Sequence, residues 1–178
     1  MDDAINESAL VIAVPEAEAL VGQWRTSLDP ACRRGVPAHV TLLYPFAPPS
    51  NIDEGIVQAL RELFRDVEPF SFSLETTAWF GERVVYLEPR PDTAFRALTS
   101  RLRERFPHYL PYGGTVHEPT PHLTLGDGAL LERLEEADEA VSIGLPLRVH
   151  STAAWLMTGG RAPQSWTTRD TFALGRGS

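Results

Sequence analysis

The chain contains no lysine, a single cysteine and no long run of apolar residues. The lone Cys32 excludes an internal disulfide and any metal site made of several cysteines. No stretch approaches the roughly 18 consecutive apolar residues that span a bilayer, so no membrane partner is expected. The amino end, residues 1–3 (Met-Asp-Asp), lacks the basic and then apolar pattern of a signal peptide, and we therefore expect a cytoplasmic protein.

Positive charge is also scarce. The 16 basic residues, all of them arginine, face 24 acidic ones, which gives a formal net charge of −8. A broad polynucleotide-binding face needs clustered positive charge, and no cluster is visible in the sequence. Part of the acid is local to residues 130–141, which is typical of the solvated face of a helix. The charge pattern therefore argues against a DNA duplex as a partner.

What the chain does have is one four-residue motif, His-apolar-Thr-Leu, that occurs twice. It stands at residues 39–42 (His-Val-Thr-Leu) and 122–125 (His-Leu-Thr-Leu). Each copy predicts a short strand, in which residues i and i+2 share a face about 7 Å apart. Histidine and threonine then lie on one face, and the apolar residues point into a core. Two such strands side by side would place four polar side chains around one cavity: His39, Thr41, His122 and Thr124.

The predicted strands and helices around the two motifs follow one another in the same order. Alternating and β-rich segments predict strands, and segments rich in Gly, Pro and Arg predict loops: strands at residues 9–14, 38–44, 69–80, 83–88, 121–126, 145–157 and 166–174, and loops at 29–37 and 107–120. Apolar stripes predict a helix opened by Pro15, one begun near Asn51 with Glu54 as its capping-box partner, one begun at Pro91, and one capped by Asp127.

This repeat predicts the fold class. We expect an α+β protein in which β-α-β-α-β occurs twice, as a bilobal pseudo-two-fold duplication with antiparallel sheets lining a central cleft and helices outside. The lobes are expected over approximately residues 1–80 and 81–178 of one interlocked domain. The matching segments Thr-Thr-Ala-Trp-Phe and Thr-Ala-Ala-Trp-Leu pair Trp79 with Trp155.

A paired His-x-Thr, each followed by Leu inside a duplicated α+β chain, resembles the 2H phosphoesterase superfamily. The resemblance is carried by His-Val-Thr-Leu-Leu-Tyr-Pro-Phe at 39–46 and Pro-His-Leu-Thr-Leu-Gly at 121–126. It is strongest toward the 2′-5′ RNA ligase-like branch, also described as RNA 2′,3′-cyclic phosphodiesterases. The resemblance implies metal-independent and cofactor-free hydrolysis of cyclic phosphodiesters or 2′-5′ linkages, with 2′-5′ ligation as the reverse direction.

The four side chains suit that chemistry. Hydrolysis of a 2′,3′-cyclic phosphate needs an activated water on one side of phosphorus and a protonated leaving oxygen on the other. Two histidines can supply the base and the acid near neutral pH, while Thr41 and Thr124 hydrogen-bond the non-bridging oxygens. Pseudo-symmetry leaves the two histidine roles open, and family habit favours His39 as base and His122 as acid. A bell-shaped pH–rate profile and insensitivity to EDTA are expected.

Some residues outside the two motifs are candidate substrate ligands. Arg33 and Arg34 precede the first motif by a few residues and could reach a terminal phosphate. The aromatic candidates for stacking on a base are Phe46, Tyr112, Trp79 and Trp155. His150 begins a third His-x-Thr that lacks the following leucine, and contact with substrate is the less favoured interpretation of it. Tyr44 leaves the polar face of its strand, so core packing is expected for it.

Two other interpretations remain open. A metal hydrolase could use His39 and His122 with Glu118 or Asp127, but threonine at i+2 is poor ligand spacing, and we expect no metal. A non-catalytic module that binds nucleotides, phosphate or another protein could keep the fold without turnover. Among the enzymatic alternatives, the lack of a basic stripe favours nucleotides, cyclic nucleotides or short RNA ends over long RNA. We expect a monomer.

Overall fold

The structure is a computed structural model and describes residues 4–176. The acidic amino end at residues 1–3, on which the expectation about a signal peptide depends, lies outside the described residues. Within residues 4–176 no helix is both long and apolar enough to cross a membrane.

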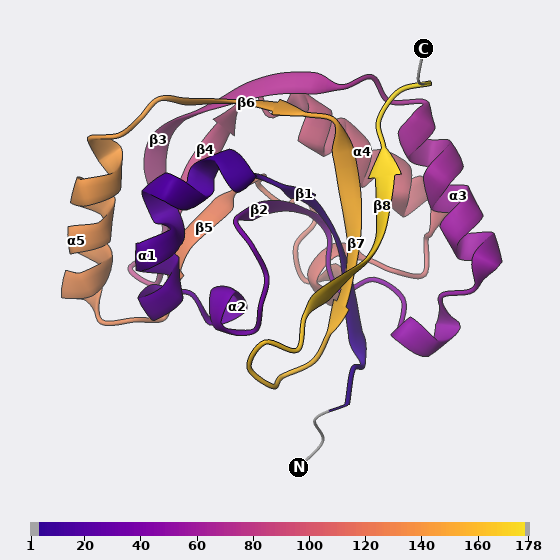
Figure 1. The fold of residues 1–178 in the computed structure, drawn as a ribbon, viewed down its shortest axis with the longest axis horizontal. Helices are drawn as coiled ribbons and strands as arrows, with labels where there is room; N and C mark the ends of the chain where they lie inside the picture. Colours follow the sequence, from indigo (N-terminus) through magenta and orange to yellow (C-terminus); the bar gives the residue numbers. More distant parts are fainter. Residues whose placement is uncertain (1–3, 177–178) are drawn as a thin grey trace.

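Two four-stranded antiparallel sheets form the centre of the molecule (Figure 1). The first sheet has the order β2-β1-β7-β8, with strands β1 (Glu7–Ala13), β2 (His39–Leu43), β7 (Ala153–Gly159) and β8 (Thr167–Ala173). The second has the order β5-β4-β3-β6, with strands β3 (Phe70–Phe80), β4 (Val84–Arg90), β5 (Leu123–Asp127) and β6 (Leu147–Ser151). The predicted α+β class with antiparallel sheets is confirmed.

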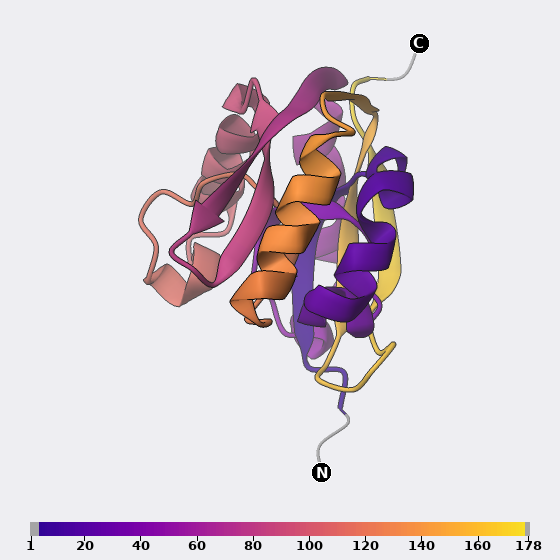
Figure 2. The ribbon, with the colours of Figure 1, turned by 90° about the vertical axis from the view of Figure 1, so that its left-hand side faces the viewer.

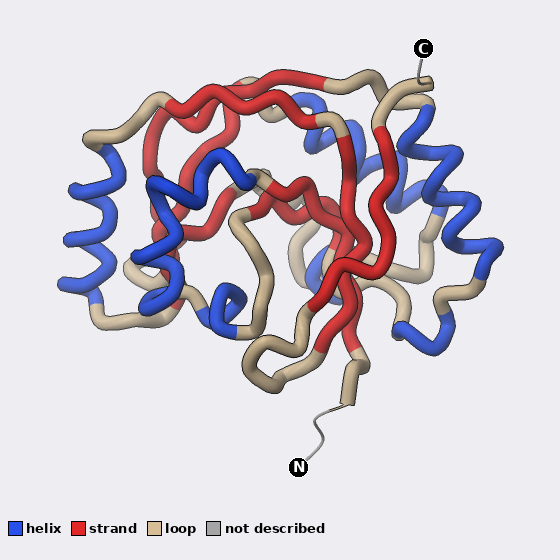
Figure 3. Tube along the Cα trace, viewed as in Figure 1, coloured by secondary structure: helices blue, strands red, loops and turns tan. Residues whose placement is uncertain are grey.

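The helices flank the sheets on both sides (Figure 3). The four longer ones are α1 (Glu18–Leu28), α3 (Glu54–Arg65), α4 (Thr93–Arg105) and α5 (Leu131–Ser142), and α2 (Pro30–Arg33) is a short one. Helices α1 and α5 lie side by side, and both contact β5 (Figure 2). Helix α4 packs on β2, and α3 packs on β8. Each strand that carries a His-apolar-Thr-Leu motif is therefore packed against at least one helix.

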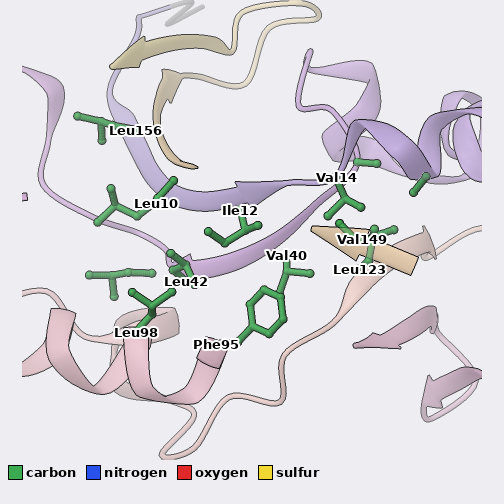
Figure 4. Close-up of a cluster of buried hydrophobic side chains, with 14 of the residues drawn as sticks. Leu10, Ile12, Val14, Val40, Leu42, Phe95, Leu98, Leu123, Val149 and Leu156 are labelled. Carbon is green, nitrogen blue, oxygen red and sulfur yellow. The ribbon is translucent and has the colours of Figure 1, made fainter. Parts of the chain in front are cut away.

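The core explains why the histidines face away from it. Leu10 and Ile12 of β1 and Leu42 of β2 are buried, and Figure 4 shows them close to Leu98 of α4. Because side chains alternate along a strand, the residues between these apolar positions point to the opposite face of the sheet. Burial of the apolar residues, each worth about 1.5–3 kcal/mol, thus fixes which face of β2 is left for polar groups.

Three local predictions are wrong. Helix α3 is capped by Asp53, whose Oδ1 accepts a 2.9 Å hydrogen bond from the Ile56 N–H, so Asn51 and Glu54 form no capping box. Asp127 caps nothing, because α5 begins four residues later and the Asp127 carboxylate pairs with Arg83 at 2.9 Å. The expected loop at 29–37 contains α2.

The strand expected at residues 145–157 is two strands in different sheets. The chain leaves the second sheet after β6 and enters the first sheet as β7. Strand β3 likewise joins β4 to β6 and not the strands that precede it. The sheets therefore do not divide the chain into residues 1–80 and 81–178, because long-range strand pairing, which the sequence repeat does not encode, decides which sheet each strand joins.

Candidate active site

The first His-Thr pair projects from β2. His39 and Thr41 are half-buried, and they alternate with the fully buried Val40 and Leu42. Both line a hollow of about 150 Å³, here called the His39 hollow. Its other walls are mostly apolar and aromatic, with one arginine: Ala9, Val11, Ala31, Arg34, Val36, Tyr44, Met157 and Trp166.

The second pair lies at the start of β5. His122 directly precedes the strand, and Thr124 is its second residue, half-buried between the buried Leu123 and Leu125. His122 and Thr124 line a larger hollow of about 380 Å³, the His122 hollow. The loop before β5 and the end of β3 supply most of its remaining wall: Phe80, Val84, Tyr112, Val116, Glu118, Pro119, Thr120 and Asp127.

The two hollows adjoin a small third hollow that lies between them, and the three together are here called the groove. The third hollow is lined by Thr41 and Tyr44 from the first motif and by Tyr112 and Thr120 from the loop before the second. Strands β2 and β5 are neighbours in space although they belong to different sheets. The structure thus brings both His-Thr pairs to the same groove, each in its own half.

Each histidine is held in the same way. His39 Nδ1 lies 2.7 Å from the carbonyl oxygen of Pro37, and His122 Nδ1 lies 2.7 Å from the carbonyl oxygen of Thr120. A carbonyl oxygen accepts but cannot donate, so each Nδ1 carries the proton and donates it. The Nε2 atom of each ring is then the nitrogen left to exchange protons with a ligand.

Both histidines favour their neutral form. Burial, together with the charges of Arg25 and His122, lowers the pKa of His39 to about 4, against the opposing effects of the hydrogen bond to Pro37 and the charge of Glu18. Burial also lowers the pKa of His122, and the hydrogen bond to Thr120 opposes this. In the free protein at neutral pH each Nε2 is therefore a proton acceptor. A bound anion would raise both pKa values.

Two aromatic residues that the sequence analysis did not select surround His122. Phe80 stacks on Tyr86 with ring centroids 4.2 Å apart. Both rings are edge-on to the His122 ring, with centroid distances of 5.1 Å from Phe80 and 5.4 Å from Tyr86. Phe80 is 39% exposed, whereas Tyr86 is buried. The signal was available, since the predicted strands 69–80 and 83–88 are joined by a short turn and must pair as a hairpin.

The sequence model of the 2′-5′ RNA ligase superfamily matches residues 13–162, which include both His-Thr pairs. The chain belongs to this superfamily. Among solved structures it is similar to Escherichia coli LigT complexed with NADP+ (24% identity, 96% of this chain and 98% of that chain, TM-score 0.60). It is also similar to LigT complexed with 3′-AMP (23%, 96% and 99%, 0.60) and to a protein of Thermus thermophilus (20%, 96% and 98%, 0.59).

These likenesses confirm the fold of the superfamily over nearly the whole chain. No curated protein matches. The predicted resemblance to the 2H phosphoesterases is confirmed by the superfamily match.

The other predicted ligands of this superfamily member are placed unevenly. Tyr112 lines the His122 hollow, as a candidate for base stacking should. Arg33 is exposed, and its carbonyl accepts a hydrogen bond from the Gln164 N–H; the arginine that lines the His39 hollow is Arg34. Phe46 lies in the core, edge-on to Phe106 at 5.2 Å, and does not line the groove.

Tyr44 packs on buried apolar residues, as expected, but on the smaller cluster beside the His39 hollow and not on the main core. It follows the last residue of β2 and lines the groove from the His39 hollow to its centre. Its hydroxyl donates a 2.8 Å hydrogen bond to Glu7, and burial, together with this carboxylate, raises the pKa of Tyr44 to about 12. The strand alternation that predicted packing on the main core is interrupted by a bulge at Leu42, which buries Leu43 as well and turns Tyr44 to the face of Thr41.

Trp155 and Trp79 are not equivalent. Trp155 pairs with Val11, which pairs in turn with Thr41, so Trp155 lies on the same face of its sheet as Thr41, two strands away. In the other sheet the residue at the corresponding register position is Ala78, not Trp79. A slip of one residue reverses the face, and Trp79 instead packs on the core.

His150 lies apart from the two His-Thr pairs. Its Nδ1 is 2.8 Å from the Ser71 hydroxyl, and it lines a separate hollow with Trp155, Glu16 and Ser151. Because β6 and β7 belong to different sheets, the third His-x-Thr crosses from one sheet to the other and does not repeat the geometry of the first two.

The ligand set considered for a metal hydrolase is not assembled. Among residues 4–176 no group of three or more His, Cys, Asp or Glu side chains is placed to hold a metal ion. Asp127 lines the His122 hollow but is paired with Arg83, and Glu118 lines the same hollow.

Proposed function

We propose that the protein is a metal-independent phosphoesterase that acts on 2′,3′-cyclic phosphate ends of nucleotides or short RNA, or on 2′-5′ phosphodiester linkages. The observation that carries this is the matched pair of histidines in one groove, each fixed through Nδ1 at 2.7 Å and each presenting Nε2. Two such nitrogens supply a general base and a general acid without a cofactor.

In the proposed reaction a phosphate sits in the groove between the two rings. The Nε2 of one neutral histidine removes a proton from water as the water oxygen bonds to phosphorus. The bond from phosphorus to the ribose oxygen breaks, and the other histidine, protonated at Nε2, gives its proton to that oxygen. The imidazoles have then exchanged protonation states, and solvent restores them. With a ribose 5′-hydroxyl in the place of water, the same steps bond that oxygen to the phosphorus of a 2′,3′-cyclic phosphate and break the bond to O3′, which takes the proton, so that a 2′-5′ linkage remains.

Thr41 and Thr124 complete the phosphate site in this proposal. Each hydroxyl lies on the same strand face as its histidine and is half-buried. A hydroxyl donates a hydrogen bond to a non-bridging oxygen without adding a charge beside the imidazole. Donors aimed at an oxygen that gains negative charge stabilise the transition state, and each is worth roughly 10²-fold in rate.

The nucleoside part of the substrate is assigned to the His122 hollow. This hollow is the larger of the two, and Phe80 and Tyr112 in its wall offer aromatic surface to a base. Stacking of a base on an aromatic side chain contributes about 1–3 kcal/mol. The crystallised E. coli LigT, of the same fold, was complexed with NADP+ and with 3′-AMP, which supports a nucleotide as ligand. Both His-Thr pairs come from one chain, so a monomer suffices.

Phosphorus NMR tests the proposal. The purified protein is incubated in EDTA with 2′,3′-cyclic AMP, 2′,3′-cyclic UMP and a 2′-5′-linked dinucleotide. We expect loss of the cyclic phosphate signal and the appearance of one monoester, and the matched variant His122→Ala should give neither. Activity that EDTA abolishes and added metal restores would refute the mechanism. Saturable binding without turnover would favour the non-catalytic module instead.

A further inference from the structure

A buried arginine contacts the segment that precedes His39. Arg25, on α1, is 1% exposed. Its Nε and Nη2 donate to Asp29 at 3.1 and 2.8 Å, and Nη2 also donates to the carbonyl oxygen of Val36 at 3.2 Å. Its Nη1 is buried without a hydrogen-bond partner among the described residues. Burial of a guanidinium with an unsatisfied donor is costly, so this side chain is not explained by packing alone.

Arg25 and Glu18 together hold the segment that fixes the His39 ring. Glu18 Oε1 lies 3.7 Å from Arg25 Nη1 and accepts a 2.6 Å hydrogen bond from the Ala38 N–H. The peptide groups on both sides of Pro37 are thus tied to α1, one through the Val36 carbonyl and one through the Ala38 N–H. Pro37 supplies the carbonyl oxygen to which the His39 ring donates.

The second histidine is supported differently. The segment before His122 is tied to a helix through Arg103, whose Nη1 donates to the His117 carbonyl oxygen at 2.9 Å, and this contact is exposed. The ring itself donates to the Thr120 carbonyl, as His39 does to Pro37. The two halves of the groove therefore share the ring geometry but differ in the buried charge near the ring.

We propose that Arg25 is a positioning residue for His39, which it acts on both by clamping the 36–38 segment with Glu18 and by placing a buried positive charge near the imidazole. A positive charge there disfavours the imidazolium and keeps His39 neutral. Resting on the proposed function, this buried charge distinguishes the two halves of the site and suits His39 to the role of base, the role that family habit favours.

The other groups around His39 are accounted for. The charged or titratable groups that face it are Arg25 and Glu18 from α1, His122 from the opposite half of the groove, and Arg34 and Tyr44, which line the same hollow. Of these, Glu18 acts against Arg25, since its negative charge favours the imidazolium. Asp29 offsets part of the Arg25 charge, and burial raises the pKa of its carboxyl.

Titration of the histidine rings by long-range ¹H–¹⁵N NMR tests this without any substrate. Arg25→Met, which removes the charge, should move the midpoint of His39 upward from about 4 by roughly half a pH unit or more, while Arg25→Lys should leave it near the wild-type value. Glu18→Gln keeps an oxygen for the Ala38 N–H and should move the midpoint downward. The control Arg61→Met, on the exposed face of α3, should change nothing.

The variants separate a charge effect from a structural one. Equal midpoints in Arg25→Met and Arg25→Lys, or an unchanged midpoint in Glu18→Gln, would overturn the proposal. If Arg25→Met does not fold, the Glu18→Gln result decides, because Glu18 is partly exposed. Because this readout needs no turnover, a protein that proves inactive on cyclic phosphates would refute the proposed function and leave the Arg25 result standing.

Discussion

The backbone N–H of Tyr112 donates a 2.6 Å hydrogen bond to the carbonyl oxygen of Tyr44, and this contact joins the residue after the first His strand to the loop before the second. Tyr112 has φ 50°, and Gly113 and Gly114 follow with φ 65° and 82°, so the loop adopts left-handed backbone where it touches the groove. Glycine tolerates this conformation at no steric cost. The contact holds the loop against the end of β2, where Tyr112 lines both the His122 hollow and the small hollow beside it.

The pH–rate profile should be displaced toward acid. If His39 is the base, kcat/KM falls as the pH drops through the pKa of His39, about 4. If His122 is the acid, kcat/KM falls as the pH rises through the pKa of His122, which burial holds below the usual 6.5. We expect a bell whose optimum in kcat/KM lies below pH 6.5, with limbs that belong to the coupled pair. Initial rates on a cyclic nucleotide, measured from about pH 3.5 to about pH 8.5, cover both limbs of this profile.

Replacement of the four polar side chains should affect turnover in a graded way. His39→Ala or His122→Ala should lower kcat by roughly 10²–10⁴-fold, because each removes a proton-transfer group. Thr41→Val or Thr124→Val, which keep the shape, should lower it by about 10²-fold or less. Circular dichroism checks the fold of each variant. Near-normal turnover by His122→Ala on a confirmed substrate would remove that residue from the mechanism.

Phe80→Ala should weaken nucleotide binding. The side chain is 39% exposed and lies edge-on to His122, so its loss removes base-stacking surface from the His122 hollow. About 1–3 kcal/mol of stacking corresponds to a roughly 5- to 100-fold rise in Kd or KM. Isothermal titration with a nucleoside monophosphate measures the change. Ile143→Ala, at an 87% exposed position after α5, is the matched control and should bind as the wild type does.

Phe46→Ala should act on stability and not on substrate. Phe46 is buried among Phe106 and Tyr109, with ring centroids 5.2 and 5.1 Å away. Truncation of a buried phenylalanine lowers the free energy of unfolding by about 3–5 kcal/mol. Denaturant unfolding measures this loss. A stable Phe46→Ala protein with a raised KM would instead show that Phe46 contacts the ligand.

The neutral state of His39 should make the fold sensitive to acid. The pKa of His39 is lower in the folded protein than in the unfolded chain, so the unfolded state binds more protons as the pH falls below about 6.5. The free energy of unfolding should decline from about pH 6.5 to pH 4, by up to roughly 3 kcal/mol from this group. In the variant His39→Asn, the free energy of unfolding should lose this part of its pH dependence, as measured by denaturant titration at about pH 7 and about pH 4.5. The exposed His108→Asn should retain it.

Local pattern predicted the parts of the site that depend on one strand. His39 and Thr41 share a face because they are two residues apart in a strand whose other residues are buried, and Thr124 follows the same rule. The rule fails at an irregularity in the strand. A bulge at Leu42 reverses the faces of the residues that follow, so Leu43 is buried and Tyr44 lines the same hollow as Thr41.

The order of residues is enough to predict the α+β class and the two polar strand faces, because the apolar residues of each strand must be buried and the period of a strand is two. What surrounds each histidine depends on the folded chain: Phe80 and Tyr86 lie beside His122, and Arg25 and Glu18 contact the segment that precedes His39. The position of Trp155 also depends on the folded chain, because Trp155 lies on the face of its sheet that carries Thr41, whereas Trp79 packs on the core. These relations join residues far apart in the chain, and strand register and helix packing, which no local repeat encodes, set them.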